Sequence, residues 1–222
     1  MAIGALLIFL AKRKKQTHAS LKQTQALTVD KVQPGQIVKI IGTVGSNQSL
    51  KTPFTQRDCV YYEYELQRET VTQDNQGREQ RRWEKTSSDK QSAPFYIQDS
   101  TGQLAVNPQG ANIEPQSLGE QIVRPGDELN NPVLKGVVNM LAGHQNKVKE
   151  EALLVGGPVY AYGYVGGDQN NMVLQKGQGD FILSYKSEKQ VEKDLARTAG
   201  LMKILGYLGI IGGVAVIVYS LF

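Results

Sequence analysis

The chain has 222 residues, of which 25 are Lys or Arg and 21 are Asp or Glu, so its formal net charge is +4. This length is enough for one domain with a real core, and a hydrophobic content of 40% argues against general disorder. The single cysteine, Cys59, excludes an intrachain disulfide. Together with His18 and His144 it leaves too few ligands for a structural zinc site. We therefore expect no metal and no cofactor.

An apolar stretch, residues 1–11, opens the chain, and four basic residues follow it directly: Lys12, Arg13, Lys14 and Lys15. The stretch is shorter than the roughly 20 residues that a membrane-spanning helix needs. A secretory signal would place its charges before the apolar run. We therefore expect an N-terminal anchor, either a short span or an interfacial segment that the basic cluster holds at the lipid surface.

Residues 12–26 are polar and predict a linker, whereas residues 27–186 have the pattern of a β-rich domain. Short β-branched or alternating runs, separated by Gly, Pro and Asp turns, are typical of strands with tight connections. The clearest runs are residues 37–44, 59–66, 94–106 (strand, turn, strand), 159–165, 172–175 and 181–185, whereas residues 107–130 resemble a loop. We therefore expect a mainly β domain of the α+β class, built as a small barrel or sandwich.

Residues 67–92 are very polar, and we expect a long exposed hairpin that turns near residues 75–77. Its arginines beside Trp83 are also compatible with a single-stranded nucleic-acid site, which needs positive charge and a stacking ring. Acidic residues are interspersed among these arginines and weaken the positive field. We therefore favour a solvated hairpin and expect no nucleic-acid partner.

Few groups in the domain are candidates for catalysis. Cys59 has no histidine near it in the sequence, and free cysteine more often packs than attacks a substrate. Alternation places Val60 and Tyr62 on one face of their strand and Glu63 and Glu65 on the other. A carboxylate pair needs a partner that the sequence does not identify. With no phosphate-binding glycine loop and no serine nucleophile elbow, we predict no catalytic residues.

The end of the chain has the pattern of a membrane segment. Residues 187–203 predict a juxtamembrane helix, and residues 204–222 are 19 residues without a charge. At about 1.5 Å per residue such a helix approaches the roughly 30 Å hydrocarbon core, so it predicts a transmembrane helix. Gly209 and Gly213 form a GxxxG pair within it. This pair indicates helix packing and a homo-oligomer, or only the general abundance of glycine in membrane helices.

Basic residues flank both apolar ends on the side of the β-rich domain. Residues 12–15 follow the first apolar stretch, and four basic residues precede the second: Lys189, Lys193, Arg197 and Lys203. Positive flanks favour the cytoplasmic side of a membrane. We therefore expect an integral membrane protein that contacts membrane lipids and whose globular domain lies on the cytoplasmic side.

Short motifs along residues 25–222 follow one another in an order that is typical of a known family. They are Gly42-Thr43-Val44, Pro53-Phe54, Cys59-Val60, Trp83, Pro94-Phe95, Asp99, Leu154 with Gly156, Gly163, Leu174-Gln175, Leu183-Ser184 and Leu205-Gly206. In this order they resemble the GIDE family, the membrane-embedded domain of E3 ubiquitin and SUMO ligases. The resemblance implies a β-rich domain beside the membrane, which in the ligases precedes a cytosolic RING. The ligands of a RING are absent from these 222 residues, so the chain is similar to a RING-less member.

These observations lead to one functional expectation and two alternatives. We expect a membrane-anchored, non-catalytic interaction or scaffold domain with a membrane protein as its partner. The first alternative is an E3 ubiquitin or SUMO ligase, or a ligase accessory, which the family resemblance implies. The second is an OB-like nucleic-acid binder, suggested by the strand–turn–strand pattern and Trp83.

Overall fold

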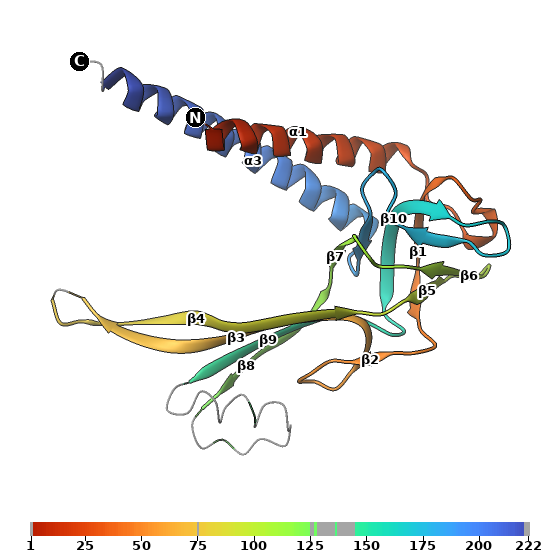
Figure 1. Ribbon diagram of the computed structural model, residues 1–222, viewed down its shortest axis with the longest axis horizontal. Helices are drawn as coiled ribbons and strands as arrows, with labels where there is room; N and C mark the ends of the chain where they lie inside the picture. Colours follow the sequence, from red (N-terminus) through yellow and green to blue (C-terminus); the bar gives the residue numbers. More distant parts are fainter. Residues whose placement is uncertain (1, 75, 125–126, 128–135, 137–144, 220–222) are drawn as a thin grey trace.

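The computed structural model describes residues 2–74, 76–124, 127, 136 and 145–219, with side chains between residues 5 and 209. A β-rich body carries two long helices and a long hairpin, and both extend from it toward the same side (Figure 1). The elements are α1 (Ala2–Gln23), the 3-10 helix η1 (Val29–Lys31), β1 (Ile37–Gly45), β2 (Leu50–Lys51), β3 (Asp58–Gln73), β4 (Glu79–Ser92), β5 (Phe95–Gln98), β6 (Gln103–Val106), β7 (Asn112–Glu114), β8 (Gln116–Val123), β9 (Asn146–Leu154), β10 (Pro158–Gly166), β11 (Val173–Gln175), β12 (Ile182–Ser184) and α3 (Glu188–Tyr219).

Five strands of the body close into a small barrel. β1 pairs with β5, β5 with β6, β6 with β11, β11 with β10, and β10 again with β1. Every pairing is antiparallel except β6–β11, which is parallel. Numbered along the chain, the ring order is 1-2-3-5-4-1, which is the connectivity of the OB fold. The predicted mainly β domain is therefore confirmed, and of the two architectures that we expected, barrel or sandwich, it is the barrel; β12 and β7 extend it from β10.

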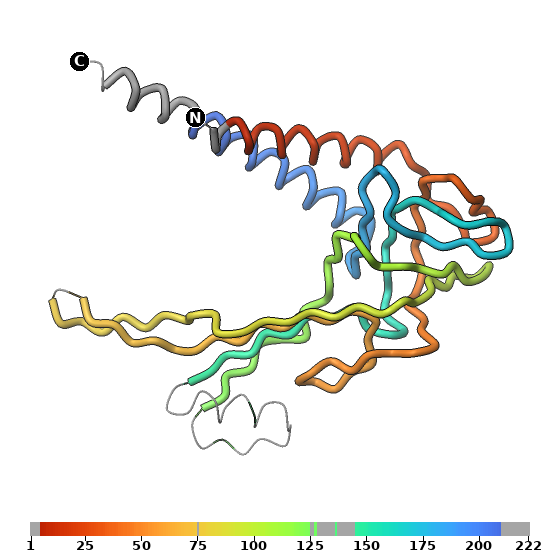
Figure 2. Tube along the Cα trace, viewed as in Figure 1, coloured from red at the N-terminus to blue at the C-terminus, as the bar shows by residue number. Residues whose placement is uncertain are grey.

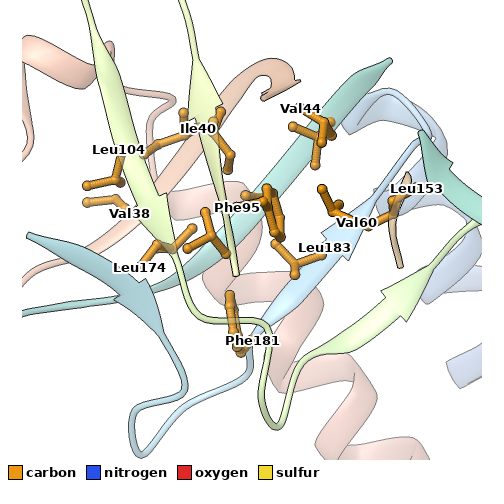
Figure 3. Packing of buried hydrophobic residues seen from close by; sticks show 14 of the residues in the cluster. Val38, Ile40, Val44, Val60, Phe95, Leu104, Leu153, Leu174, Phe181 and Leu183 are labelled. Carbon is orange, nitrogen blue, oxygen red and sulfur yellow. The ribbon is translucent and has the colours of Figure 1, made fainter. Parts of the chain in front are cut away.

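Inward-facing side chains fill the barrel because each strand alternates between its interior and its surface. Val38 and Ile40 of β1 are fully buried and share one core cluster with Leu174 of β11 and with Leu183 of β12, the strand that extends the barrel (Figure 3). Gly163 of β10 permits the ring of Phe181, in the segment before β12, to pack closely against the strand. A Cβ at Gly163 would lie 2.6 Å from the ring of Phe181, so a larger residue there would displace this part of the core.

The second sheet has the order β2-β3-β9-β8, and β4 adds to β3. β3 and β4 pair over most of their lengths and form the predicted long hairpin, with its turn between Asp74 and Arg78. The loop expected at residues 107–130 is wrong in part, because β7 and β8 lie within it. β7 pairs with β12 and β8 with β9, both distant in the chain, so no local signal marks them.

A β-bulge changes the predicted faces of β3. Its pairing with β9 shifts between Cys59 and Tyr61, so Val60 is an extra residue on β3. Val60 consequently joins Tyr61 in the barrel core, whereas Tyr62 packs in another cluster with Cys59. The expectation that Val60 and Tyr62 share a face was therefore wrong.

The two helices lie side by side and run in opposite directions, as Figures 1 and 2 show. α1 is continuous to Gln23, so residues 12–23 are helical and not the linker that we expected. Lys, Arg and Gln are strong helix formers, and no Gly or Pro interrupts the chain between Gly4 and Pro34. α3 likewise continues from the predicted juxtamembrane helix to Tyr219.

A cluster of buried side chains attaches the helices to the barrel. Leu21 of α1 and Val191 of α3 pack against Tyr160 on the outer face of β10. Within the described residues, no helix is both long and apolar enough to cross a bilayer. Residue 209 is the last with a described side chain. Most of the expected span, residues 204–222, lies beyond it, and Gly213 lies beyond it too.

Candidate functional site

The helical pair carries the basic residues that the sequence singled out. Lys12, Arg13, Lys14 and Lys15 occupy successive positions of α1, and successive residues of a helix differ by about 100° in direction. They therefore face different sides. Lys12 and Lys15 line a groove between the two helices, whereas Arg13 and Lys14 line a cavity on the barrel side. No ion pair joins any of the four to a residue in the described part of the chain.

The groove between the helices has a volume of about 470 Å³. Its basic lining comes from both helices: Lys12, Lys15 and His18 from α1, and Lys203 from α3. The remaining lining consists of Ile8 and the small residues Ala11, Ala196, Ala199 and Gly200. None of the described residues that line this groove is acidic, so the lining itself does not offset the charge of the lysines.

The cavity on the barrel side is smaller, about 250 Å³, and has a mixed lining. Arg13, Lys14 and Lys176 contribute positive charge, and Asp180 contributes the negative charge. The Thr17 hydroxyl donates a hydrogen bond to Asp180 Oδ2, which ties α1 to the loop before β12. Asp180 therefore offsets part of the positive charge in this cavity.

Beyond the basic residues, the helical pair exposes large apolar side chains. Leu6 and Phe9 of α1 are 56% and 63% exposed, and Leu208 of α3 is 59% exposed. Further exposed apolar residues of α3 in this region are Leu201, Ile204, Leu205 and Tyr207. Several exposed large apolar side chains on one pair of helices are typical of a site that meets a protein or a membrane. Lys203 lies at its border, with Nζ 5.9 Å from the centroid of the Tyr207 ring.

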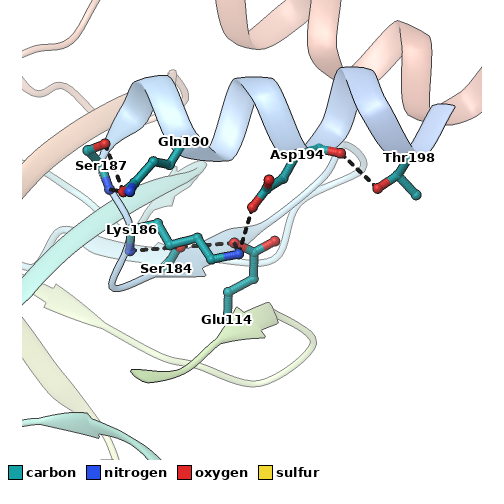
Figure 4. A network of polar contacts seen from close by, with 7 residues as sticks. All are labelled: Glu114, Ser184, Lys186, Ser187, Gln190, Asp194 and Thr198. Carbon is teal, nitrogen blue, oxygen red and sulfur yellow. Dashed lines mark hydrogen bonds and ion pairs between the residues drawn. The ribbon is translucent and has the colours of Figure 1, made fainter. Parts of the chain in front are cut away.

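A polar network fixes the start of α3 on the barrel (Figure 4). Lys186 Nζ lies 2.7 Å from Asp194 Oδ2 and 3.9 Å from Glu114 Oε2 on β7. The hydrogen bond to Asp194 raises the pKa of Lys186, and the same contact lowers the pKa of Asp194. The Ser187 amide donates to Gln190 Oε1 at 3.1 Å, as in an N-terminal capping box. The Ser187–Gln190 spacing was a usable sequence signal that we missed.

The second sheet forms a polar groove of about 580 Å³ beside the β3–β4 hairpin. Both glutamates that the sequence placed on one strand face line this groove, but they have different partners. Glu65 bonds to Lys85 at 3.2 Å, whereas Glu63 accepts a hydrogen bond from the Tyr61 hydroxyl and lies opposite Glu151 of β9. Burial, and then the hydrogen bond and charge of Glu63, raise the pKa of Glu151. Glu151 is the carboxyl partner that sequence reasoning could not identify.

Cys59 has the environment of a structural thiol. It is fully buried, and its Sγ faces the Leu50 carbonyl oxygen at 3.7 Å. The pKa of the thiol is raised to about 11, mainly by burial and secondly by the nearby charge of Glu150. A thiolate is the nucleophilic form of cysteine, so this site suppresses the reactive form at neutral pH.

The contacts of the hairpin bear on the nucleic-acid alternative. Lys147 Nζ lies 4.6 Å from the centroid of the Trp83 ring, on the face that a base would need for stacking. Arg78 pairs with Asp74 at 2.9 Å, and Arg81 pairs with Glu69 at 3.4 Å. These contacts engage the ring and the arginines on which that alternative depended. Among the described residues, no group of three His, Cys, Asp or Glu side chains could hold a metal ion.

Comparison with known proteins identifies one related family. The family model GIDE, described as an E3 ubiquitin ligase, matches residues 64–218. This range extends from the middle of β3 to the last turn of α3, so it includes β9, every barrel strand except β1, and one helix of the pair. No curated protein and no solved structure matches the chain.

Proposed function

This chain belongs to the GIDE family, and we propose that it is a non-catalytic interaction domain that α1 and α3 anchor in a membrane. The exposed apolar end of the helical pair is the observation that carries the proposal. Leu6, Phe9 and Leu208 expose more than half of their surface there, whereas the basic residues lie nearer the barrel. Burying apolar surface is worth about 25 cal/mol per Å², so lipid is a more favourable environment than water for this end.

The order of residues along the pair supports a direction for the anchor. Lys12 and Lys15 of α1 lie beside Lys203 of α3, so the basic residues of both helices lie at one level. Lysine stems cross the border of the hydrocarbon while their amines stay with the headgroups. The barrel then lies on the basic side of the membrane, which is the cytoplasmic side by the positive-inside tendency.

Two introduced cysteines test the anchor, because they have similar exposure in different places. Leu208 is 59% exposed on α3 and Val71 is 50% exposed on the hairpin. In sealed inside-out vesicles, a membrane-impermeant maleimide should label the Val71→Cys variant and leave Leu208→Cys unlabelled. In SDS both should react. Equal labelling of both variants in intact vesicles would contradict the membrane anchor.

The native Cys59 gives little background in this experiment, since it is buried and its pKa is about 11. The same Val71→Cys variant tests the side of the membrane. We expect labelling in inside-out vesicles and protection in intact cells. The reverse pattern would place the domain on the opposite face.

Anchoring at two helices limits the orientation of the barrel and raises its effective concentration for partners in the same membrane. The hairpin and the polar groove beside it are the surfaces that we assign to a protein partner. Crosslinking in native membranes, followed by gentle solubilisation, tests this assignment. A stoichiometric membrane protein that crosslinks to the hairpin supports it. Recovery of only a homo-oligomer would instead direct attention to Gly209 and Gly213, and Gly209→Ile should then dissociate it.

A ligase role is the second candidate, and the description of the family model favours it. Transfer by a RING requires zinc ligands that the single cysteine and two histidines of these 222 residues do not supply. In this role the chain would act as an accessory to a RING-bearing protein. An assay with ubiquitin, activating and conjugating enzymes, with and without the crosslinked partner, tests it. Transfer that depends on this chain would establish the accessory role.

A further inference from the structure

The groove between α1 and α3 is positively charged on both of its walls. Lys12 and Lys15 face it from α1, and Lys203 faces it from α3. None of the three forms an ion pair with a described residue, and no acidic side chain lines the groove. Three like charges around one cavity repel each other, so an anion in the groove would relieve this repulsion.

The floor of the groove leaves room for such an anion. It consists of the small residues Ala11, Ala196, Ala199 and Gly200, and the volume is about 470 Å³. A Cβ placed on Gly200 would meet no atom within 4 Å, so the space above this glycine is open. A Cβ at Gly200 therefore causes no clash, and a larger side chain at this lining position should take up space in the groove.

We propose that this groove binds the phosphate group of an anionic phospholipid. The proposal rests on the membrane anchor proposed above. Lysine ammonium groups bind phosphate oxygens through charge-assisted hydrogen bonds, and basic pockets between membrane helices bind anionic headgroups. Ile8 lines the same groove, and the exposed Phe9 and Ile204 are neighbours of groove residues on the apolar side. A lipid with its phosphate among the lysines can lay its acyl chains along this apolar surface.

α1 itself contains a matched control for the charge in the groove. Lys12 and Lys15 line the groove, whereas Arg13 and Lys14 line the separate cavity in which Asp180 offsets part of the charge. Changing either pair to Gln lowers the net charge by the same amount at the same level of α1. If lipid binds only by general attraction to positive charge, the two double variants should lose the same amount of binding. If it binds in the groove, the Lys12 and Lys15 variant should lose more.

The test measures binding of fluorescent phosphatidylglycerol to the full chain in micelles of a nonionic detergent. We expect Lys12→Gln with Lys15→Gln, and separately Gly200→Leu, to weaken binding at least tenfold. Arg13→Gln with Lys14→Gln should weaken it less than threefold. Circular dichroism of the Gly200→Leu variant checks that the fold is kept, and Gly200→Ala serves as its milder counterpart.

Three outcomes would overturn the proposal: equal losses from the two double variants, unchanged binding in Gly200→Leu, or displacement of the lipid by millimolar inorganic phosphate. The last would assign the groove to a soluble phosphate. The assay uses micelles, so its result is separate from the vesicle labelling. Protection of Leu208→Cys with no effect of the groove variants would overturn the lipid site and leave the membrane anchor in place.

Discussion

Lys39 Nζ on strand β1 lies 2.5 Å from Glu188 Oε1 in the first turn of α3. Glu192 Oε1, one turn further along the helix, lies 3.8 Å from the same amine. The Lys39 side chain is 2% exposed, so these two carboxylates replace the water that would otherwise solvate its charge. The barrel therefore contains a buried charge that α3 neutralises, and the orientation of the helical pair on the barrel depends on this contact.

This contact predicts that the two partners differ in their effect on stability. Glu188→Gln combined with Glu192→Gln leaves a buried ammonium without a counter-charge, which should cost about 3–5 kcal/mol. Lys39→Met keeps the shape and leaves two carboxylates that are 34% and 21% exposed and so can be hydrated. It should cost clearly less. Urea unfolding in detergent measures both free energies, and equal losses would contradict the asymmetry.

The pair of Glu63 and Glu151 predicts a pH-dependent stability. The pKa of Glu151 is raised above its ordinary value, chiefly by burial and then by Glu63. The folded protein thus favours the protonated carboxyl, and its contribution to stability is lost as the pH rises through the raised pKa. Glu151→Gln, which imitates the protonated form, should therefore raise the free energy of unfolding at pH 7. Below about pH 4 the gain should vanish, because the carboxyl is then protonated in both states.

Glu65 provides a control of opposite sign on the same sheet. Hydrogen bonds from Gln67 and Lys85 lower its pKa, so its contribution to stability is present at neutral pH and is lost as the pH falls through the lowered pKa. Glu65→Gln should reduce the free energy of unfolding at pH 7, and the difference should shrink in acid. A gain at pH 7 from both variants would indicate a general effect of net charge on stability.

The parts of the fold that the sequence predicts are those with local signals. Alternation and turn residues mark β1, β10 and the long hairpin, and all of them are present. β7 and β8 form because distant strands pair with them, and the bulge at Val60 depends on the register with β9. The candidate site divides in the same way. Residues 12–15 were identifiable from the sequence, but which of them face the groove depends on the approach of α3.

The outer part of the hairpin makes few contacts with the rest of the protein, so we expect that deleting it leaves the barrel intact. Beyond residue 69, the described residues of β3 pair only with β4, and none of the side chains described between residues 70 and 82 is buried. Replacing residues 70–82 with Asn-Gly, a turn that suits hairpins, should change the free energy of unfolding by less than about 0.5 kcal/mol. Thermal unfolding measures this. A large loss of stability would mean that the outer hairpin supports the barrel. If the deletion variant still crosslinks to the membrane partner as the full chain does, the outer hairpin is not the partner surface.

Cys59 lies close in the chain to the loop between β2 and β3, residues 52–57, and can report on whether this loop is held in place. Its thiol, with a pKa of about 11, should not react with a water-soluble disulfide reagent at pH 8 until the protein unfolds. The buried carboxylate of Glu150 accepts hydrogen bonds from the Phe54 amide at 2.8 Å and the Thr55 amide at 3.0 Å. It also accepts one from the Thr55 hydroxyl at 2.6 Å, and thus holds this loop in place.

Removing that carboxylate should expose the thiol. Glu150→Ala releases the loop and also removes a negative charge that raises the pKa of Cys59, so both effects increase its reactivity. Glu151→Ala is the matched control, because the neighbouring residue faces the polar groove on the other side of β9. Reagent uptake in the folded state, with circular dichroism as the check on folding, should rise in the first variant and stay low in the second. Equal reactivity of the two would show that the loop is held by contacts other than those of Glu150.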